Sequence, residues 1–205
     1  SGIARFGRRC RDRRILRRRR CGFDRAQGCV CSLEQSIDRG GIALDRLRRD
    51  GITVLSTERA ARQEIRELHV GLLNMMPDAA LEATERQFYR LVGESNPIAQ
   101  FYMHPFTLPT LPRGAAAQAH IAQVYESFDA IREKGLDALI ITGANVSHPN
   151  LADEPFWQPL IEVIDWAWDH VTSTLCSCLA THAVMQFRYG QTRVKQPHKI
   201  WGVFE

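Results

Sequence analysis

Cys178 is the residue in this chain whose position is most typical of catalytic chemistry. It lies within residues 172–185, where strand-favouring residues up to Leu175 give way to helix-favouring residues from Leu179 onward. A cysteine at such a turn faces the first backbone N–H groups of the helix, whose partial positive charge favours the nucleophilic thiolate. The same N–H groups, beginning with that of Leu179, can stabilise an oxyanion when sulfur attacks a carbonyl carbon. The turn therefore predicts a nucleophile and an oxyanion site together.

A purely structural interpretation of the two neighbouring cysteines stays open. Most cysteines of reduced proteins are small buried hydrophobic residues, and a lone cysteine is a weak signal for catalysis. Cys176 precedes Cys178 by two residues on the predicted strand, so it lies on the same face of the sheet but deeper, and we expect it in the core. A disulfide between them is not expected, because alternate strand positions are poorly placed for bridging.

The elements expected around this turn alternate between strands and helices. Apolar runs predict strands at residues 51–55, 69–76, 98–106, 138–144, 172–177 and 200–204. Apolar periodicity predicts helices at residues 43–49, 78–92, 115–134, 154–170 and 179–189, with Asp78 as the cap of the second. This alternation is typical of an α/β fold, a three-layer sandwich with a mainly parallel sheet. Cys178 and the loops after Met76 and Ala144 then meet at the carboxyl ends of the strands, where such folds bind ligands.

The bulk composition indicates one globular domain. The chain has 205 residues, of which 44% are hydrophobic and 24% charged. It contains no apolar run near the roughly 20 residues of a membrane span and no secretory signal, so we expect no membrane association. Its six cysteines do not form a secreted disulfide framework, and we expect a reduced, cytoplasmic protein.

Residues 1–31 differ from the rest of the chain. Ten arginines and one acidic residue fall within residues 1–20, which leaves 17 of the 27 basic and 22 of the 23 acidic residues for the remainder. We therefore predict an Arg-rich, disordered extension over residues 1–31, or one translated from a start codon placed too far upstream, and an α/β domain over residues 32–205. An arm that binds nucleic-acid phosphates is the remoter alternative, and the acidic body gives no reason to expect such a partner.

Several motifs occur in order from about residue 42 to residue 205. They are Leu-Asn-Met-Met-Pro at 73–77, Thr-Glu-Arg-Gln-Phe at 84–88, Leu-Ile-Ile-Thr-Gly-Ala at 139–144, Asp-Trp at 165–166, Val-Thr-Ser-Thr-Leu at 171–175 before Cys178, and Gly-Val-Phe at 202–204. Together they resemble the homoserine O-succinyltransferase/O-acetyltransferase family of methionine biosynthesis. The resemblance implies a flavodoxin-like fold similar to that of class I glutamine amidotransferases.

The resemblance also implies an activity. In this family a cysteine takes an acyl group from succinyl-CoA or acetyl-CoA, and the hydroxyl of homoserine then takes it from the thioester. Cys178 matches the nucleophile, Lys199 a substrate-binding lysine, and Ser147 the position that selects the acyl donor. Acyl-CoA is then a co-substrate, with no further cofactor and no metal implied, and the family allows a homodimer.

Departures from the family pattern leave two other functions open. The family's general-base histidine and its partner glutamate follow the Gly-Val-Phe segment, so the resemblance implies that they would lie beyond Glu205 and that the C-terminal part of the family domain is missing here. His104 and His148 are the histidines most readily placed near the active edge. One alternative is a glutamine amidotransferase-like hydrolase that uses the same cysteine. The other is a non-catalytic remnant without the histidine and glutamate.

Overall fold

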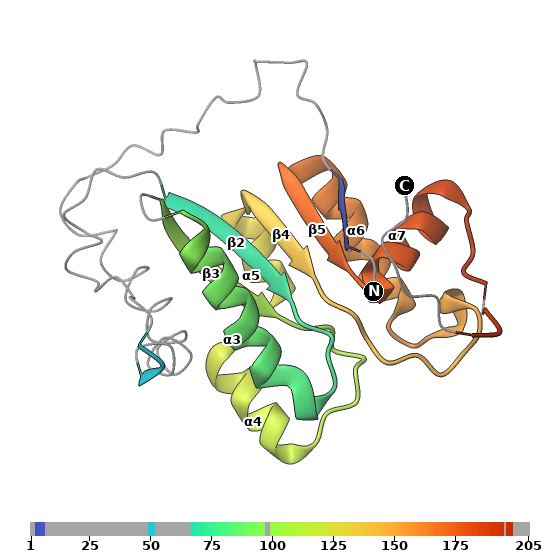
Figure 1. Ribbon diagram of the computed structural model, residues 1–205, viewed down its shortest axis with the longest axis horizontal. Helices are drawn as coiled ribbons and strands as arrows, with labels where there is room; N and C mark the ends of the chain where they lie inside the picture. Colours follow the sequence, from blue (N-terminus) through green and yellow to red (C-terminus); the bar gives the residue numbers. More distant parts are fainter. Residues whose placement is uncertain (1–2, 7–48, 52–66, 97–98, 195, 199–205) are drawn as a thin grey trace.

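The structure, a computed structural model, describes residues 3–6, 49–51, 67–96, 99–194 and 196–198 (Figure 1). The strand predicted at residues 200–204, Lys199 and all but the first residue of the strand predicted at 51–55 lie outside these residues. So do nearly all of the helix predicted at 43–49 and nearly all of the predicted extension over 1–31.

A five-stranded sheet forms the centre of the described fold, in the order β1-β5-β4-β2-β3. Its strands are β1 (Ile3–Phe6), β2 (Glu67–Leu73), β3 (Gln100–Phe106), β4 (Ala138–Ile141) and β5 (Ser173–Ser177). The pairs β2–β3, β2–β4 and β4–β5 are parallel, and only β1 runs antiparallel, along the outer edge of β5. The expected mainly parallel α/β sheet is confirmed. The strand β1 was not predicted, because backbone pairing of four residues leaves no periodicity in an Arg-rich stretch.

Helices cover both faces of this sheet and give the three layers (Figure 1). They are α3 (Asp78–Ser95), α4 (Ala115–Val124), α5 (Phe128–Lys134), α6 (Trp157–His170) and α7 (Leu179–Tyr189), with a short 3₁₀ turn η1 (Leu151–Asp153) before α6.

Alternate residues of the strands belong to different cores, because successive side chains of a strand point to opposite faces. Leu73, Ile141 and Cys176 pack with residues of α5, α6 and α7. Their neighbours Leu72 and Ile140 pack with Tyr89 of α3 on the other face. The parallel strands are therefore buried on both sides, as their continuous apolar runs predict.

Two local predictions were wrong. The helix expected over residues 115–134 is broken between α4 and α5, because Ser127 caps α5 by accepting a hydrogen bond from the N–H of Ala130 (3.2 Å). Glu126, inside the break, donates its backbone N–H to Pro105 O of β3 (2.8 Å). Asp78 does not cap α3, whose N-cap is Pro77 without a side-chain hydrogen bond. Apolar periodicity does not reveal the break between α4 and α5, since the apolar residues on both sides of it keep helical spacing.

Candidate active site

Cys178 occupies a strained turn between β5 and α7. Its backbone has φ 56° and ψ −117°, and it is the one non-glycine residue with positive φ among the described residues. Such a conformation costs on the order of 1–3 kcal/mol and persists only where the surrounding structure enforces it. A sharp strand-to-helix turn of this kind lifts a nucleophile out of the sheet at its carboxyl edge. The predicted turn is therefore present, with the cysteine at its apex.

The two cysteines of this segment differ in their surroundings. Cys178 is exposed, whereas Cys176 is fully buried, as expected for a core residue. Burial raises the pKa of the Cys176 thiol to about 12, so it stays protonated near neutral pH. Cys178 is thus the thiol that a reagent in solution can reach.

Contacts on either side of Cys178 hold the turn in place. The hydroxyl of Thr181 donates to Cys176 O (3.2 Å), and the backbone N–H of Thr181 donates to Cys178 O (3.1 Å). Leu179 and Ala180 are buried beneath the first turn of α7. The backbone on both sides of Cys178 is thereby fixed, which leaves the turn little freedom to relax its positive φ.

Gly143, just beyond β4, borders the thiol. A Cβ atom built on Gly143 would lie 3.1 Å from Cys178 Cβ, 3.3 Å from its Sγ and 3.7 Å from the backbone N of Leu179. Any side chain here would crowd the sulfur and the N–H predicted to stabilise an oxyanion. The absence of a side chain therefore keeps open the space beside the Cys178 thiol.

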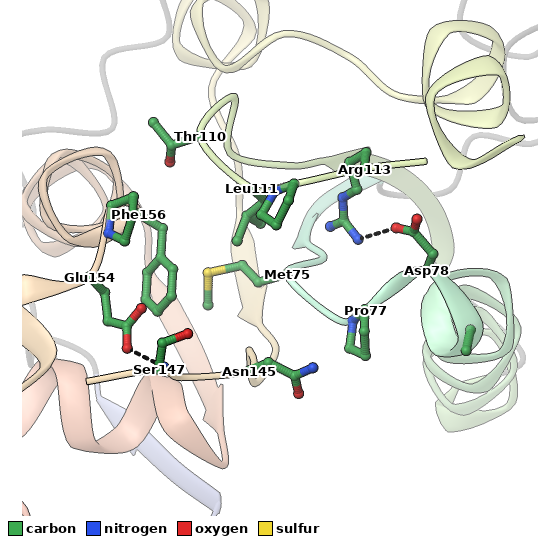
Figure 2. A pocket seen from close by; sticks show the side chains of 13 residues that line it. Met75, Pro77, Asp78, Thr110, Leu111, Arg113, Asn145, Ser147, Glu154 and Phe156 are labelled. Atoms are coloured by element: carbon green, nitrogen blue, oxygen red, sulfur yellow. Dashed lines mark hydrogen bonds and ion pairs between the residues drawn. The ribbon is translucent and has the colours of Figure 1, made fainter. Parts of the chain in front are cut away.

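A cavity of about 500 Å³ opens two residues further along this loop, at Asn145. Its walls come from the loops after β2, β3 and β4 and from the segment before α6 (Figure 2). The lining residues are Met75, Pro77, Asp78, Ala79, Thr110, Leu111, Pro112, Arg113, Asn145, Ser147, Glu154, Pro155 and Phe156. The loops after Met76 and Ala144 meet at this cavity, as predicted, and Ser147 lies in its wall, whereas Cys178 is not among the lining residues.

The cavity has two polar ends and an apolar middle (Figure 2). Met75 and Leu111 lie between Ser147 with Glu154 at one end and Arg113 with Asp78 at the other. The ring of Phe156 lies beside Ser147 and Glu154. This arrangement suits a short acyl chain or an amino-acid side chain whose ends are polar.

Arg113 closes one end of the cavity by binding the stretch that follows β2. Its guanidinium donates to Met76 O (2.5 Å), Asn74 O (3.3 Å) and Asp78 Oδ1 (3.2 Å). Asp78 also accepts the N–H of Gly114 (2.8 Å). That N–H and the guanidinium lower the pKa of Asp78, which is therefore ionised and neutralises the arginine.

Glu154 closes the other end. Its Oε1 accepts the backbone N–H of Ser147 (2.5 Å) and of His148 (2.6 Å), and His148 Nδ1 lies 3.5 Å away. The side chain is 3% exposed. Burial raises the pKa of this carboxyl, but the two N–H groups and His148 lower it further, so the net shift is downward and Glu154 is ionised. Neither Glu154 nor Arg113 was predicted from the sequence, because nothing local marks a charged residue whose partners lie in other segments.

The two histidines considered in the sequence differ in location. His148 lies in the loop that forms the cavity wall. His104 is buried within β3, where its ring nitrogens contact His69 Nδ1 (2.8 Å) and Glu126 Oε1 (2.6 Å). His104 is therefore engaged in the core and not available as a base at the edge.

Among the described residues, no cluster of three or more His, Cys, Asp or Glu side chains could hold a metal ion. Within the same residues, every helix is too short or too polar to cross a bilayer.

The fold and the site together define an α/β protein with an exposed cysteine at a strand-to-helix turn and a ligand-sized cavity among the loops that follow its strands. The chain belongs to the homoserine O-succinyltransferase family, since the model of that family matches residues 36–205. It is 88% identical over 161 residues to the homoserine O-succinyltransferase of Thiobacillus denitrificans, covering 78% of this chain and 46% of that protein. It is 69% identical to the protein of that name from Thioalkalivibrio nitratireducens and 70% identical to the one from Allochromatium vinosum, with 78% of this chain and 45% and 44% of those proteins covered. The chain thus spans a little under half the length of these relatives.

Proposed function

We propose that this chain carries the nucleophile of an acyltransferase that moves a succinyl or acetyl group from acyl-CoA to the hydroxyl of homoserine, in methionine biosynthesis. The observation that carries the proposal is the exposed Cys178 at a positive-φ turn, in a chain whose relatives are named homoserine O-succinyltransferase. Acyl-CoA serves as co-substrate, and the chemistry needs no further cofactor.

The proposed reaction has two halves. The Cys178 thiolate attacks the thioester carbonyl of acyl-CoA, the carbon–sulfur bond to CoA breaks, and the CoA thiolate leaves. The homoserine oxygen then attacks the new thioester, its proton passes to a base, and Cys178 is released as a thiolate. The N–H of Leu179, which borders the space beside Gly143, is the proposed donor to the oxyanion in both halves.

Two further roles rest on the resemblance. Lys199 is proposed to bind a substrate carboxylate, and the base of the second half is proposed to come from the family histidine that follows the Gly-Val-Phe segment. Ser147 is proposed to contribute to donor choice, which its place in the cavity wall supports.

Intact-mass spectrometry after mixing the chain with acetyl-CoA or succinyl-CoA tests the first half directly. We expect a mass increase of one acyl group, mapped by peptide analysis to Cys178 and lost in Cys178→Ala. Cys176→Ala is the matched control, because that thiol is buried and protonated and its removal should leave the labelling in place. Labelling that persists in Cys178→Ala, or none with either donor, would refute the proposal.

A further inference from the structure

The hydroxyl group of Thr142 lies between the cavity wall and the residue that borders the Cys178 thiol. Thr142 directly follows β4 and is 2% exposed. Its Oγ1 accepts the backbone N–H of Met75 (2.8 Å) and donates to the backbone oxygen of Gly143 (3.1 Å). Met75 lines the middle of the cavity (Figure 2), and Gly143 is the residue at which a Cβ atom would lie 3.3 Å from Cys178 Sγ. One hydroxyl is therefore bound to both parts of the candidate site.

Threonine suits this position because a hydroxyl group can accept and donate a hydrogen bond at the same time, and because its branched Cβ restricts χ1. The backbone N–H of Thr142 donates to Leu73 O (3.0 Å), which fixes the main chain from which the hydroxyl extends. Met75 is 2% exposed, so its N–H cannot turn to solvent where it stands. A buried N–H without an acceptor is costly, so removal of the hydroxyl should displace the stretch that contains Met75.

We propose that Thr142 is a positioning residue for the acylation of Cys178. By donating to Gly143 O, its hydroxyl fixes the orientation of the peptide group beside the thiol. By accepting the N–H of Met75, it keeps the cavity wall at a fixed distance from that peptide group. The acyl group in the cavity and the sulfur that attacks it are thereby aligned, which is a large part of the rate of such a reaction. The inference rests on the proposed function and adds to it a role for Thr142 that the resemblance does not assign.

The hydrogen bond to Met75 can be tested without catalysis. NMR of the full chain measures how fast the amide hydrogen of Met75 exchanges with solvent. We expect this exchange to be about tenfold faster or more in Thr142→Val, which has the same shape without the hydroxyl, and close to that of the unmodified chain in Thr142→Ser. The amides of β2 are the internal reference, because neither substitution removes a hydrogen bond from that strand. Equal Met75 exchange in Thr142→Val and the unmodified chain would overturn the role of the hydroxyl.

The role in the reaction is tested by time courses of acylation, followed by intact mass at several concentrations of acetyl-CoA and, separately, of succinyl-CoA. We expect the maximal rate to fall about tenfold or more in Thr142→Val and to recover to within about threefold in Thr142→Ser. Alkylation of Cys178 by iodoacetamide should change by less than about twofold, because this small reagent needs no alignment in the cavity. The turn itself is bound by Thr181, which both substitutions leave in place.

Thr174→Val is the matched control. Thr174 lies on β5 next to β4, is 1% exposed, and its Oγ1 has no hydrogen-bond partner among the described residues. The same substitution there should leave both rates as they are in the unmodified chain. If Thr142→Val does not fold, as judged by circular dichroism, Thr142→Ala is compared with Thr142→Ser, because these two side chains differ only by the hydroxyl oxygen.

The outcomes separate this inference from the proposed function. Labelling of the unmodified chain by neither donor refutes the acyltransfer proposal, and with it a role of Thr142 in acylation. If the unmodified chain is labelled, an undiminished maximal rate in Thr142→Val, or equal rates in Thr142→Val and Thr142→Ser, overturns the positioning role while the acyltransfer proposal stands. A matching fall in acylation and alkylation overturns it as well, because the turn at Cys178 and not the alignment would then have changed.

Discussion

Replacing Cys178 by glycine should leave the protein more stable than replacing it by alanine. Cys178 has φ 56°, a region that costs a residue with a side chain about 1–2 kcal/mol and glycine almost nothing. Glycine loses about 0.4–1 kcal/mol more than alanine through the greater freedom of its unfolded state. Because the Cys178 side chain is exposed, little apolar burial is lost in either variant. We therefore expect Cys178→Gly to exceed Cys178→Ala in free energy of unfolding by about 1 kcal/mol.

Chemical denaturation monitored by circular dichroism measures this difference, and thermal unfolding should show it as an increase in Tm of about 3 °C. Gly190 provides the calibration within the same helix. It ends α7 with φ 65°, and a Cβ atom there would meet nothing within 4 Å, so Gly190→Ala adds backbone strain without a clash. Gly190→Ala should lower the free energy of unfolding by about 1 kcal/mol.

The comparison can refute the reasoning. If Gly190→Ala is destabilising as expected but Cys178→Gly is no more stable than Cys178→Ala, the turn at Cys178 is not strained. The strand-to-helix turn would then be a relaxed connection, and the strongest structural argument for a nucleophile elbow would be lost.

Two further predictions concern the site and the core behind it. Gly143→Ala should slow alkylation of Cys178 by iodoacetamide about tenfold or more, because the new Cβ would lie 3.3 Å from Sγ; an unchanged rate would contradict the crowding. Glu126 is buried, which raises its pKa, but His104 and Lys134 lower it to about 2, below the ordinary 4.5. Its contribution to stability, at most about 3 kcal/mol, is thus complete above pH 4.5 and lost as pH falls toward 2. Chemical denaturation at several pH values should show that the free energy of unfolding falls less steeply on acidification in Glu126→Gln than in the unmodified chain. Parallel curves for the two proteins would contradict a stabilising role of the contacts of Glu126 with His104 and Lys134.

The fold could be predicted largely because its parallel strands are buried on both faces. The strand at residues 138–141 and helix α6 can be predicted from local sequence patterns alone. The position of Cys178 between a strand and a helix follows from the patterns on either side of it. The break between α4 and α5 could not be predicted in this way. It depends on Glu126, whose backbone binds β3 and whose carboxylate binds His104 and Lys134. Partners 8 and 22 residues away are not visible in a local pattern.

The candidate site was also predicted only in part, because many of its contacts join segments that are far apart in the sequence. Sequence reasoning located the turn that carries Cys178 and, through the resemblance, Ser147 in the cavity wall, but it missed the charged residues that line the cavity. Asp78 was predicted as a helix cap, yet its carboxylate binds Arg113 and the N–H of Gly114 in the loop after β3. A carboxylate near a helix start has several partners of similar strength available, and tertiary structure decides among them.

Helix α7 joins Cys178 to the cavity wall, so changes in this helix and changes in the wall should have different effects. Beyond the elbow, Gln186 of α7 donates to Asn150 Oδ1 (2.9 Å), and Arg193 donates to Pro149 O (3.0 Å) and His148 O. The loop that carries Ser147 is thus bound from outside by the helix that begins after Cys178, and from inside by Glu154. Loosening α7 displaces the thiol and the wall together, so it should alter both the rate of acylation and the choice of donor. A change at Glu154 removes a contact to the wall but none to the turn at Cys178, so it should displace the wall alone.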